Sequence, residues 1–229
     1  PSGVYNYDLP NFFIDKGQLW QGAGCRFKNY SIDPNVSALR YVGYSNALTL
    51  LSGRLRDLAV VGTSLADNGI MVGKDNLTIA GEFSTKRVMV HNFTKYGATA
   101  VVGISGTKNK FEQLYCSGNW RNLYFPDGDL CSMWDFDFCS FLYSGAQNID
   151  LRGLHNGTFR QSEIAHSTTE AIYCQGKNAR NIVFENPWFE SNDYTDYKVL
   201  LTGTGWADLC INVTLDRPYF QDDVKTIKF

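Results

Sequence analysis

The chain has 229 residues, a hydrophobic content of 44%, an aromatic content of 14% and a formal net charge of −2. This composition supplies enough apolar surface for a sizeable core. The sequence has no long basic run, whereas binding to nucleic acid phosphates needs clustered Lys and Arg. Its apolar stretches are all shorter than the ~20 residues of a membrane-spanning helix. We therefore expect neither nucleic acid nor a membrane as a partner.

Regular spacing of apolar residues begins near residue 51, and the first 50 residues lack it. We expect residues 1–50 to form an N-terminal cap and a first irregular coil, because the end of a stacked fold needs covering. We expect residues 51–229 to form regular coils. The sequence of residues 224–229 is typical of the start of another strand, so we expect the coils to continue beyond this segment.

From residue 58 onward, short apolar segments return about every 23 residues. The first series begins at Leu58, Val88, Phe111, Trp134, Phe159, Ile182 and Val213. The second series begins at Ile70, Ala100, Leu123, Ile149, Ile172 and Val199. Two series in step indicate two strands per repeat, and a fixed repeat indicates stacking. No helical pattern fits between the strands, so the spacing predicts an all-β, single-stranded parallel β-helix.

Two late repeats support this interpretation. Residues 181–190 read NIVFENPWFE and residues 212–221 read NVTLDRPYFQ, and the two segments agree in residue character along their length. Within each strand we expect residues i and i+2 to face the interior and residues i+1 and i+3 to face solvent. This alternation predicts which side chains of each coil are available for function.

The six cysteines form no Cys-x-x-Cys pair, and the three histidines do not cluster with them at zinc spacing. Cysteine is among the most buried residue types, so we expect free thiols in the core. We predict no structural metal and no cofactor.

Acidic side chains gather at outward positions of the central repeats. Glu112 and Asp135 fall at i+1 and Asp137 at i+3, while Glu185 lies two repeats beyond Asp137. Two repeats correspond to roughly 9.6 Å of backbone separation, a spacing that suits glycoside hydrolysis by paired carboxylates. Like charges also raise a carboxyl pKa, which would provide a general acid near neutral pH. We predict Asp135, Asp137, Glu112 and Glu185 as catalytic residues.

Arg160 falls one repeat after these acids, where it would orient an anionic sugar or stabilise a carboxylate. The alternative is that the same side chains form an ordinary solvated ion network, since the outer surface of a stacked fold is usually charged. Three other acidic residues are weaker catalytic candidates: Glu163, Glu170 and Glu190.

Aromatic residues form a second signal, because flat sugar faces stack on exposed rings. Several lie at or near the ends of the expected strands: Trp120, Tyr124, Trp188, Tyr194, Tyr197, Trp206 and Tyr219. We predict Trp188, Tyr194 and Trp206 as substrate-binding residues, with core packing as the alternative role for all the rings.

The chain also resembles a known group of proteins. Residues 1–5 read PSGVY, residues 21–24 read QGAG, and residues 181–185 read NIVFE. These segments resemble the opening and the strand starts of the pectate-lyase-like right-handed parallel β-helices, whose aromatic-rich members are bacteriophage tailspikes and capsule depolymerases. The resemblance implies a right-handed coil, a parallel homotrimer and a bacterial surface polysaccharide as partner.

Taken with the carboxylates, the resemblance predicts a phage tailspike or fibre, located in the virion, that binds and hydrolyses a capsule or O-antigen polysaccharide. Two alternatives remain open. One is a non-catalytic structural or adhesive shaft. The other is a secreted polysaccharide lyase, which would release an unsaturated product.

Overall fold

The computed structural model describes residues 4–7, 12–14, 19–29, 37–41, 54–62, 67–72, 83–100, 108–126, 131–175, 178–190, 199–202, 211–221 and 227–228. All regular elements within these ranges are β-strands, which confirms the all-β prediction. A search of the same ranges finds no helix with the length and apolar character needed to cross a membrane.

The described strands form two parallel sheets. The 13-stranded sheet has a main path of β1 (Val4–Tyr7), β3 (Leu19–Asn29), β5 (Arg54–Gly62), β7 (Ser84–His91), β9 (Asn109–Ser117), β11 (Cys131–Asp137), β14 (Leu154–Arg160), β17 (Arg180–Glu185) and β20 (Ile211–Asp216). A branch that starts from β9 contains β12 (Ser140–Ser144), β15 (Glu163–Ser167), β18 (Trp188–Glu190) and β21 (Tyr219–Phe220). The 9-stranded sheet contains β2 (Phe12–Ile14), β4 (Ser37–Tyr41), β6 (Asn68–Val72), β8 (Tyr96–Ala100), β10 (Arg121–Phe125), β13 (Ile149–Leu151), β16 (Ile172–Gln175), β19 (Val199–Thr202) and β22 (Ile227–Lys228).

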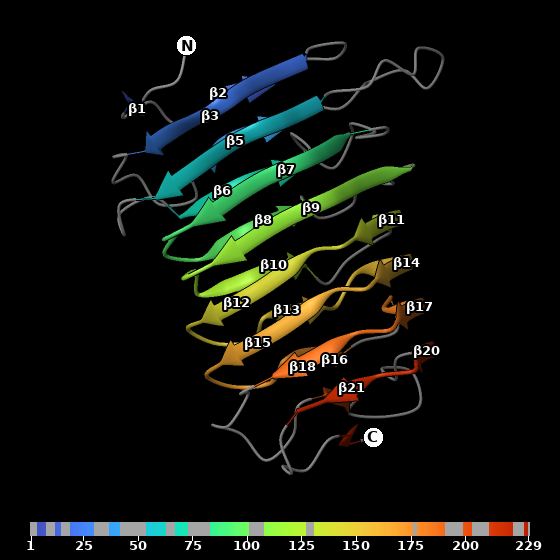
Figure 1. Cartoon of the computed structure of the whole chain (residues 1–229). Helices are drawn as coiled ribbons and strands as arrows, with labels where there is room; N and C mark the ends of the chain where they lie inside the picture. Colours follow the sequence, from blue (N-terminus) through green and yellow to red (C-terminus); the bar gives the residue numbers. More distant parts are fainter. Residues whose placement is uncertain are drawn as a thin grey trace.

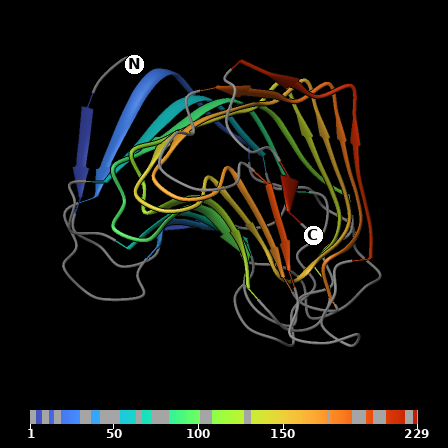
Figure 2. The same ribbon diagram turned by 90° about the horizontal axis from the view of Figure 1, so that it is seen from below.

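The chain passes from one sheet to the other in each coil, and each strand pairs with its equivalent in the neighbouring coils. In Figure 1 the strands in front run leftward and those behind run rightward as the chain descends from the N-terminus, which is a right-handed winding. Figure 2, seen from below, shows the coils stacked around a common interior. The predicted parallel β-helix is therefore confirmed. β3 pairs with β5 and β4 pairs with β6, so both sheets continue across the boundary predicted at residue 50.

Each coil of the larger sheet bends at an equivalent position, where one residue has the left-handed conformation. In register order these residues are Asp57, Arg87, Gln113, Phe138, Gln161, Asn186 and Arg217, with φ between 48° and 55°. Because this residue points outward like the one before it, two consecutive side chains face solvent and the next turns inward. We call this column the A/B corner, the outer surface before it face A, and the outer surface after it face B.

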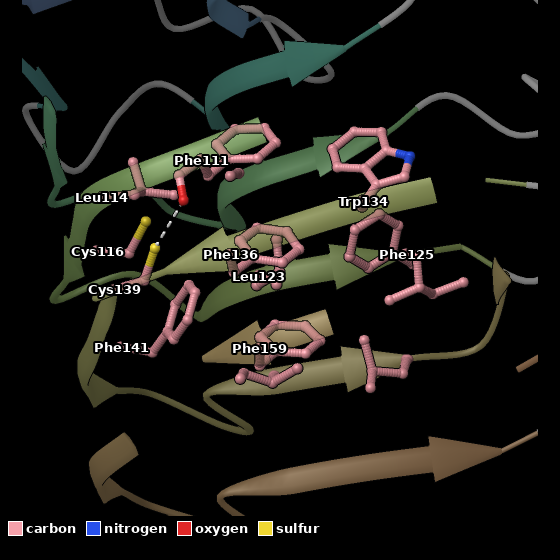
Figure 3. Close-up of a cluster of buried hydrophobic side chains, with 14 of the residues drawn as sticks. Phe111, Leu114, Cys116, Leu123, Phe125, Trp134, Phe136, Cys139, Phe141 and Phe159 are labelled. Carbon is pink, nitrogen blue, oxygen red and sulfur yellow. Dashed lines mark hydrogen bonds between the residues drawn. The ribbon is translucent and has the colours of Figure 1, made fainter. Parts of the chain in front are cut away.

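Stacked aromatic rings fill the core between the sheets. Phe111, Phe136 and Phe159 lie above one another in Figure 3, with ring centroids 4.9 Å and 4.5 Å apart, and Phe184 follows at 4.5 Å. Trp134 packs edge-on against Phe125 of the other sheet, at 4.8 Å. Burial of such rings is the largest favourable term in a fold of this kind.

A buried asparagine ladder satisfies backbone groups where the coils pass from face B to the smaller sheet. Asn119 Nδ2 donates to Asn122 Oδ1 at 2.8 Å, and Asn122 Nδ2 donates to Asn148 Oδ1 at 2.6 Å. Asn122 Nδ2 also donates to the Leu142 carbonyl at 2.8 Å. All three asparagines are buried. The ladder meets the requirement that buried polar groups be hydrogen-bonded.

The predicted registers are correct in the smaller sheet except at one rung, where Ala98 and not Ala100 aligns with Leu123. In the larger sheet four of the six predicted pairings are wrong. Val88 aligns with Leu114, three residues beyond the predicted Phe111. Phe111 aligns with Phe136, two residues beyond the predicted Trp134. Trp134 aligns with Gly157 and not Phe159, and Phe159 aligns with Phe184 and not Ile182. The A/B corner causes the first of these errors, because its extra outward residue interrupts strict alternation. The others exchange inward residues two positions apart, which alternation alone does not distinguish.

The prediction of free core thiols is confirmed for four cysteines: Cys116, Cys131, Cys139 and Cys174. Burial raises the pKa of Cys131 and of Cys139 to about 12, so both remain protonated. The side chain of Cys25 and the whole of Cys210 lie outside the described residues.

Candidate functional site

Four of the five predicted charged residues lie in one column of face A. Glu112 pairs in register with Asp137, Asp137 with Arg160, and Arg160 with Glu185. The predicted separation of two rungs between Asp137 and Glu185 is therefore confirmed. The predicted pairing of Glu112 with Asp135 is wrong, because Asp135 aligns with Lys110.

Each carboxylate of this column contacts a cation. Arg160 Nη1 donates to Asp137 Oδ1 at 2.9 Å, and Arg160 Nε lies 3.3 Å from Glu185 Oε2. Asp135 lies at a longer 3.9 Å from Arg160 Nη1. Two lysines complete the network: Lys110 with Asp137 at 3.0 Å, and Lys86 with Glu112.

The electrostatic environment of Asp137 is opposite to that predicted. Partial burial by itself would raise the pKa of Asp137, but hydrogen bonds from Arg160 and Lys110 outweigh it and lower that pKa below its usual value of 3.8. The prediction that neighbouring carboxylates would make a general acid here is wrong for Asp137. This carboxylate stays ionised at neutral pH.

A groove of about 440 Å³ lies beside this column, at the A/B corner. Gln161 and Asn186 line it from the corner, and Glu163 and Trp188 line it from face B. Glu163 and Trp188 are register neighbours on adjacent strands. The groove therefore combines two amides, one carboxylate and one indole at the corner between two faces of the larger sheet. Among the described residues predicted for substrate binding, Trp188 lines it.

The Trp188 ring is 48% exposed and meets the ring of Tyr219, one rung further, edge to face at a centroid distance of 5.0 Å. Phe138, at the same corner two rungs before Asn186, is also exposed. The other two predicted substrate-binding aromatics, Tyr194 and Trp206, lie outside the described residues. The weaker candidate Glu163 thus lines the groove. Glu170, another weaker candidate, instead accepts a hydrogen bond from Gln147 Nε2 at 2.9 Å.

Sequence reasoning missed a buried carboxylate on the smaller sheet. Asp150 is fully buried and lies 3.1 Å from Arg121 Nε and 3.0 Å from Arg152 Nε. Burial raises the pKa of Asp150 against the opposing effect of both arginines. The guanidinium groups in turn lie over the rings of Tyr124 and Tyr173. Asp150 occupies an outward-facing position of its strand, so the strand pattern alone does not reveal that it is buried.

In the described part of the chain, no three His, Cys, Asp or Glu side chains are grouped so as to hold a metal ion. The arrangement of residues in the groove is instead one of hydrogen-bonding side chains around an exposed ring.

The parallel stacking, the bent coils and the corner groove define a β-solenoid. No protein-family model matches the chain, and no curated protein matches it. A solved structure similar to it is ORF18 of Geobacillus virus E2, with a TM-score of 0.55 and 11% sequence identity. The match covers 95% of this chain and 52% of that protein, so the chain spans about half the length of the phage protein. At this identity the likeness establishes the fold.

Proposed function

We propose that the chain is a β-helical part of a phage tailspike or fibre that binds a bacterial surface polysaccharide in the groove at the A/B corner. The observation that carries the proposal is the exposed Trp188 ring beside Gln161, Glu163 and Asn186. The fold shared with a phage protein supports the setting. A virion location and a parallel homotrimer belong to the same proposal.

The chemistry of the groove suits a sugar ring. The apolar face of a pyranose packs on an indole, while its hydroxyls need donors and acceptors at the rim. The amides of Gln161 and Asn186 supply both, and the Glu163 carboxylate accepts. Because these residues stand on stacked strands, little conformational entropy is lost when a ligand binds.

The test is retention of purified capsular and O-antigen polysaccharides by the immobilised protein. Trp188→Ala should weaken binding of the retained polymer at least tenfold, whereas Trp120→Ala, which removes an exposed indole elsewhere, should leave it unchanged. Equal retention by the wild-type protein and the Trp188→Ala variant would disprove the groove assignment.

Cleavage is a second candidate function, favoured by the placement of Glu163 in the groove beside the face A carboxylates. Since the pKa of Asp137 is lowered, Asp137 would serve as base or nucleophile and Glu163 as the acid. Chain length of the bound polymer, followed by size-exclusion chromatography, tests this. Shortening that is lost in Glu163→Gln with binding retained would support hydrolysis. No shortening of a polymer that binds would leave an adhesive shaft, and an ultraviolet-absorbing product would indicate a lyase.

A further inference from the structure

Cationic side chains dominate face A at the N-terminal end of the well-described coils. Six positive residues lie on or beside β5, β7 and β9: Arg54, Arg56, Lys86, Arg87, Lys108 and Lys110. The acidic residues on this surface are Asp57 and Glu112. On β11, β14, β17 and β20 the balance reverses, with acids Asp135, Asp137, Glu185 and Asp216 against Arg160, Arg180 and Arg217. We call the six cations the basic patch.

The cations of the basic patch extend further into solvent than the acids that pair with them. The Lys110 side chain is 51% exposed, while Asp137 beneath it is 13% exposed. Arg87 is 46% exposed, while its partner Asp57 is 20% exposed. Internal pairing therefore leaves these cationic side chains more exposed than their acidic partners. An approaching ligand meets positive charge first.

The basic patch and the groove share the A/B corner. In register order the corner passes from Arg87 through Gln113 and Phe138 to Gln161 and Asn186. Adjacent rungs are ~4.8 Å apart, so a chain lying along the corner would meet Arg87 roughly 14 Å from Gln161. One extended polymer can therefore contact both places at once.

We propose that the basic patch binds acidic units of the polysaccharide held in the groove, so that the ligand is an anionic polymer carrying carboxylate or phosphate groups. This inference rests on the proposed function and adds the chemical class of the ligand. Lys and Arg heads in successive rungs offer one cationic contact per rung along the polymer. Arg suits a planar carboxylate or a phosphate, and Lys contributes a point charge.

Four probes separate the possibilities: alginate as a polycarboxylate, poly(glycerol phosphate) as a polyphosphate, dextran as a neutral polymer and duplex DNA as a competing polyanion. Binding is measured by isothermal titration at low and at high salt. We expect at least one anionic probe to bind, dextran to bind at least tenfold more weakly, and the anionic affinity to fall as salt is raised. Which anionic probe binds more tightly identifies the acidic group. Equal binding of dextran, or tighter binding of duplex DNA than of both anionic polymers, would overturn the proposal.

The decisive variant is Lys86→Gln combined with Lys110→Gln, with Arg217→Gln as the matched control on the acidic end of the same solenoid. The double variant should lose at least tenfold in anionic affinity and most of the salt dependence, and the control should lose neither. Because Lys110 contacts Asp137, the melting temperature of each variant is recorded as well. Lys108→Gln, at an exposed position of the basic patch, provides a second variant that leaves this contact intact. Unchanged affinity in both patch variants would sink the proposal.

Trp188→Ala separates this inference from the groove assignment. If both hold, Trp188→Ala weakens the anionic probe and the polymer retained from the capsule panel, while the patch variants weaken acidic polymers alone. If Trp188→Ala has no effect and the patch variants still do, the groove assignment fails and the basic patch stands.

Discussion

Arg160 connects three successive coils on face A. Its Nη1 donates to Asp137 Oδ1 at 2.9 Å in the preceding coil, and its Nε lies 3.3 Å from Glu185 Oε2 in the following coil. The Arg160 side chain is itself partly exposed, so the contacts are screened by solvent and each stabilises the fold only modestly. We expect the contribution of this network to stability to be measurable at Asp137, which is less exposed and also contacts Lys110.

The first prediction concerns acid stability. Because the folded-state pKa of Asp137 is below its usual value of 3.8, the ionised carboxylate favours the folded state. This contribution is present at pH values above 3.8 and is lost as the pH falls through the lowered pKa. Asp137→Asn should therefore reduce the free energy of unfolding by about 1–2 kcal/mol at pH 7, and the difference from wild type should shrink below pH 3.8. Urea unfolding followed by circular dichroism across this range measures it.

The control for Asp137→Asn is Asp135→Asn. Asp135 lies on the same strand but is more exposed and farther from Arg160, at 3.9 Å. Its loss should cost less than Asp137→Asn at every pH. A difference between wild type and Asp137→Asn that stays constant down to pH 2 would contradict the electrostatic account.

The second prediction uses two phenylalanines of one coil. Phe136 is fully buried and stacks on Phe111 and Phe159, whereas Phe138 at the A/B corner is 58% exposed. Phe136→Ala should lower the free energy of unfolding by about 3–5 kcal/mol, because it removes buried area and leaves a cavity. Phe138→Ala should change it by about 0.5 kcal/mol or less. Comparable losses in the two variants would show that the rings do not form the core described here.

The third prediction compares buried and exposed asparagines. Asn122→Ala would leave Asn119 Nδ2, the Leu142 carbonyl and Asn148 Oδ1 without this partner inside the protein. Because buried polar groups without a partner are costly, we expect a loss of about 3 kcal/mol. An exposed ladder is formed by Asn156, Asn181 and Asn212, whose side chains hydrogen-bond to one another. There Asn181→Ala should cost about 1 kcal/mol or less, since water replaces the lost bonds. Chemical denaturation of both variants tests the comparison, and similar losses would contradict it.

The two series of apolar strands were predictable from the sequence because apolar segments recur in step. From β11 onward, however, the strand of the larger sheet divides at the A/B corner, so these coils have three strands and not the predicted two. The pairing of Val88 with Leu114 was missed because strict alternation assumes one outward residue between two inward ones. Each bent coil has two, as in Phe111-Glu112-Gln113-Leu114, where both ends are buried. The same pattern of inward, outward, outward, inward recurs at Leu55–Leu58, Thr85–Val88 and Phe136–Cys139. This pattern is visible in the sequence and indicates the position of the A/B corner.

A second register error, a shift of two residues, explains why only part of the candidate site was predicted correctly. It exchanged Asp135 for Asp137 as the neighbour of Glu112, because Trp134 and Phe136 are equally good apolar anchors. The groove was harder to foresee, since Gln161 and Asn186 come together only where two corners stack. The burial of Asp150 depends on Arg121 and Arg152 from two positions in the chain, which a strand pattern alone does not reveal.

A fourth prediction extends the exposed asparagine ladder by one rung. Asn181 Nδ2 donates to Asn156 Oδ1 and Asn212 Nδ2 donates to Asn181 Oδ1, both at 3.0 Å. Met133 occupies the preceding rung of this column, exposed and in the same left-handed conformation at φ 58°. Asparagine tolerates this conformation better than methionine does, and it would offer an acceptor to Asn156 Nδ2. Met133→Asn should therefore raise the free energy of unfolding by about 0.5–1 kcal/mol.

The matched comparison for that design is Met133→Leu, which keeps an apolar side chain at the strained position. It should give no gain, because neither the backbone preference nor the hydrogen bond improves. Removing the donor by combining Met133→Asn with Asn156→Ala should abolish the gain if the ladder carries it. A gain that persists in the double variant would instead assign the effect to the backbone conformation at residue 133 alone. Thermal and urea unfolding of the variants distinguish these outcomes, since only a ladder contribution requires both side chains together.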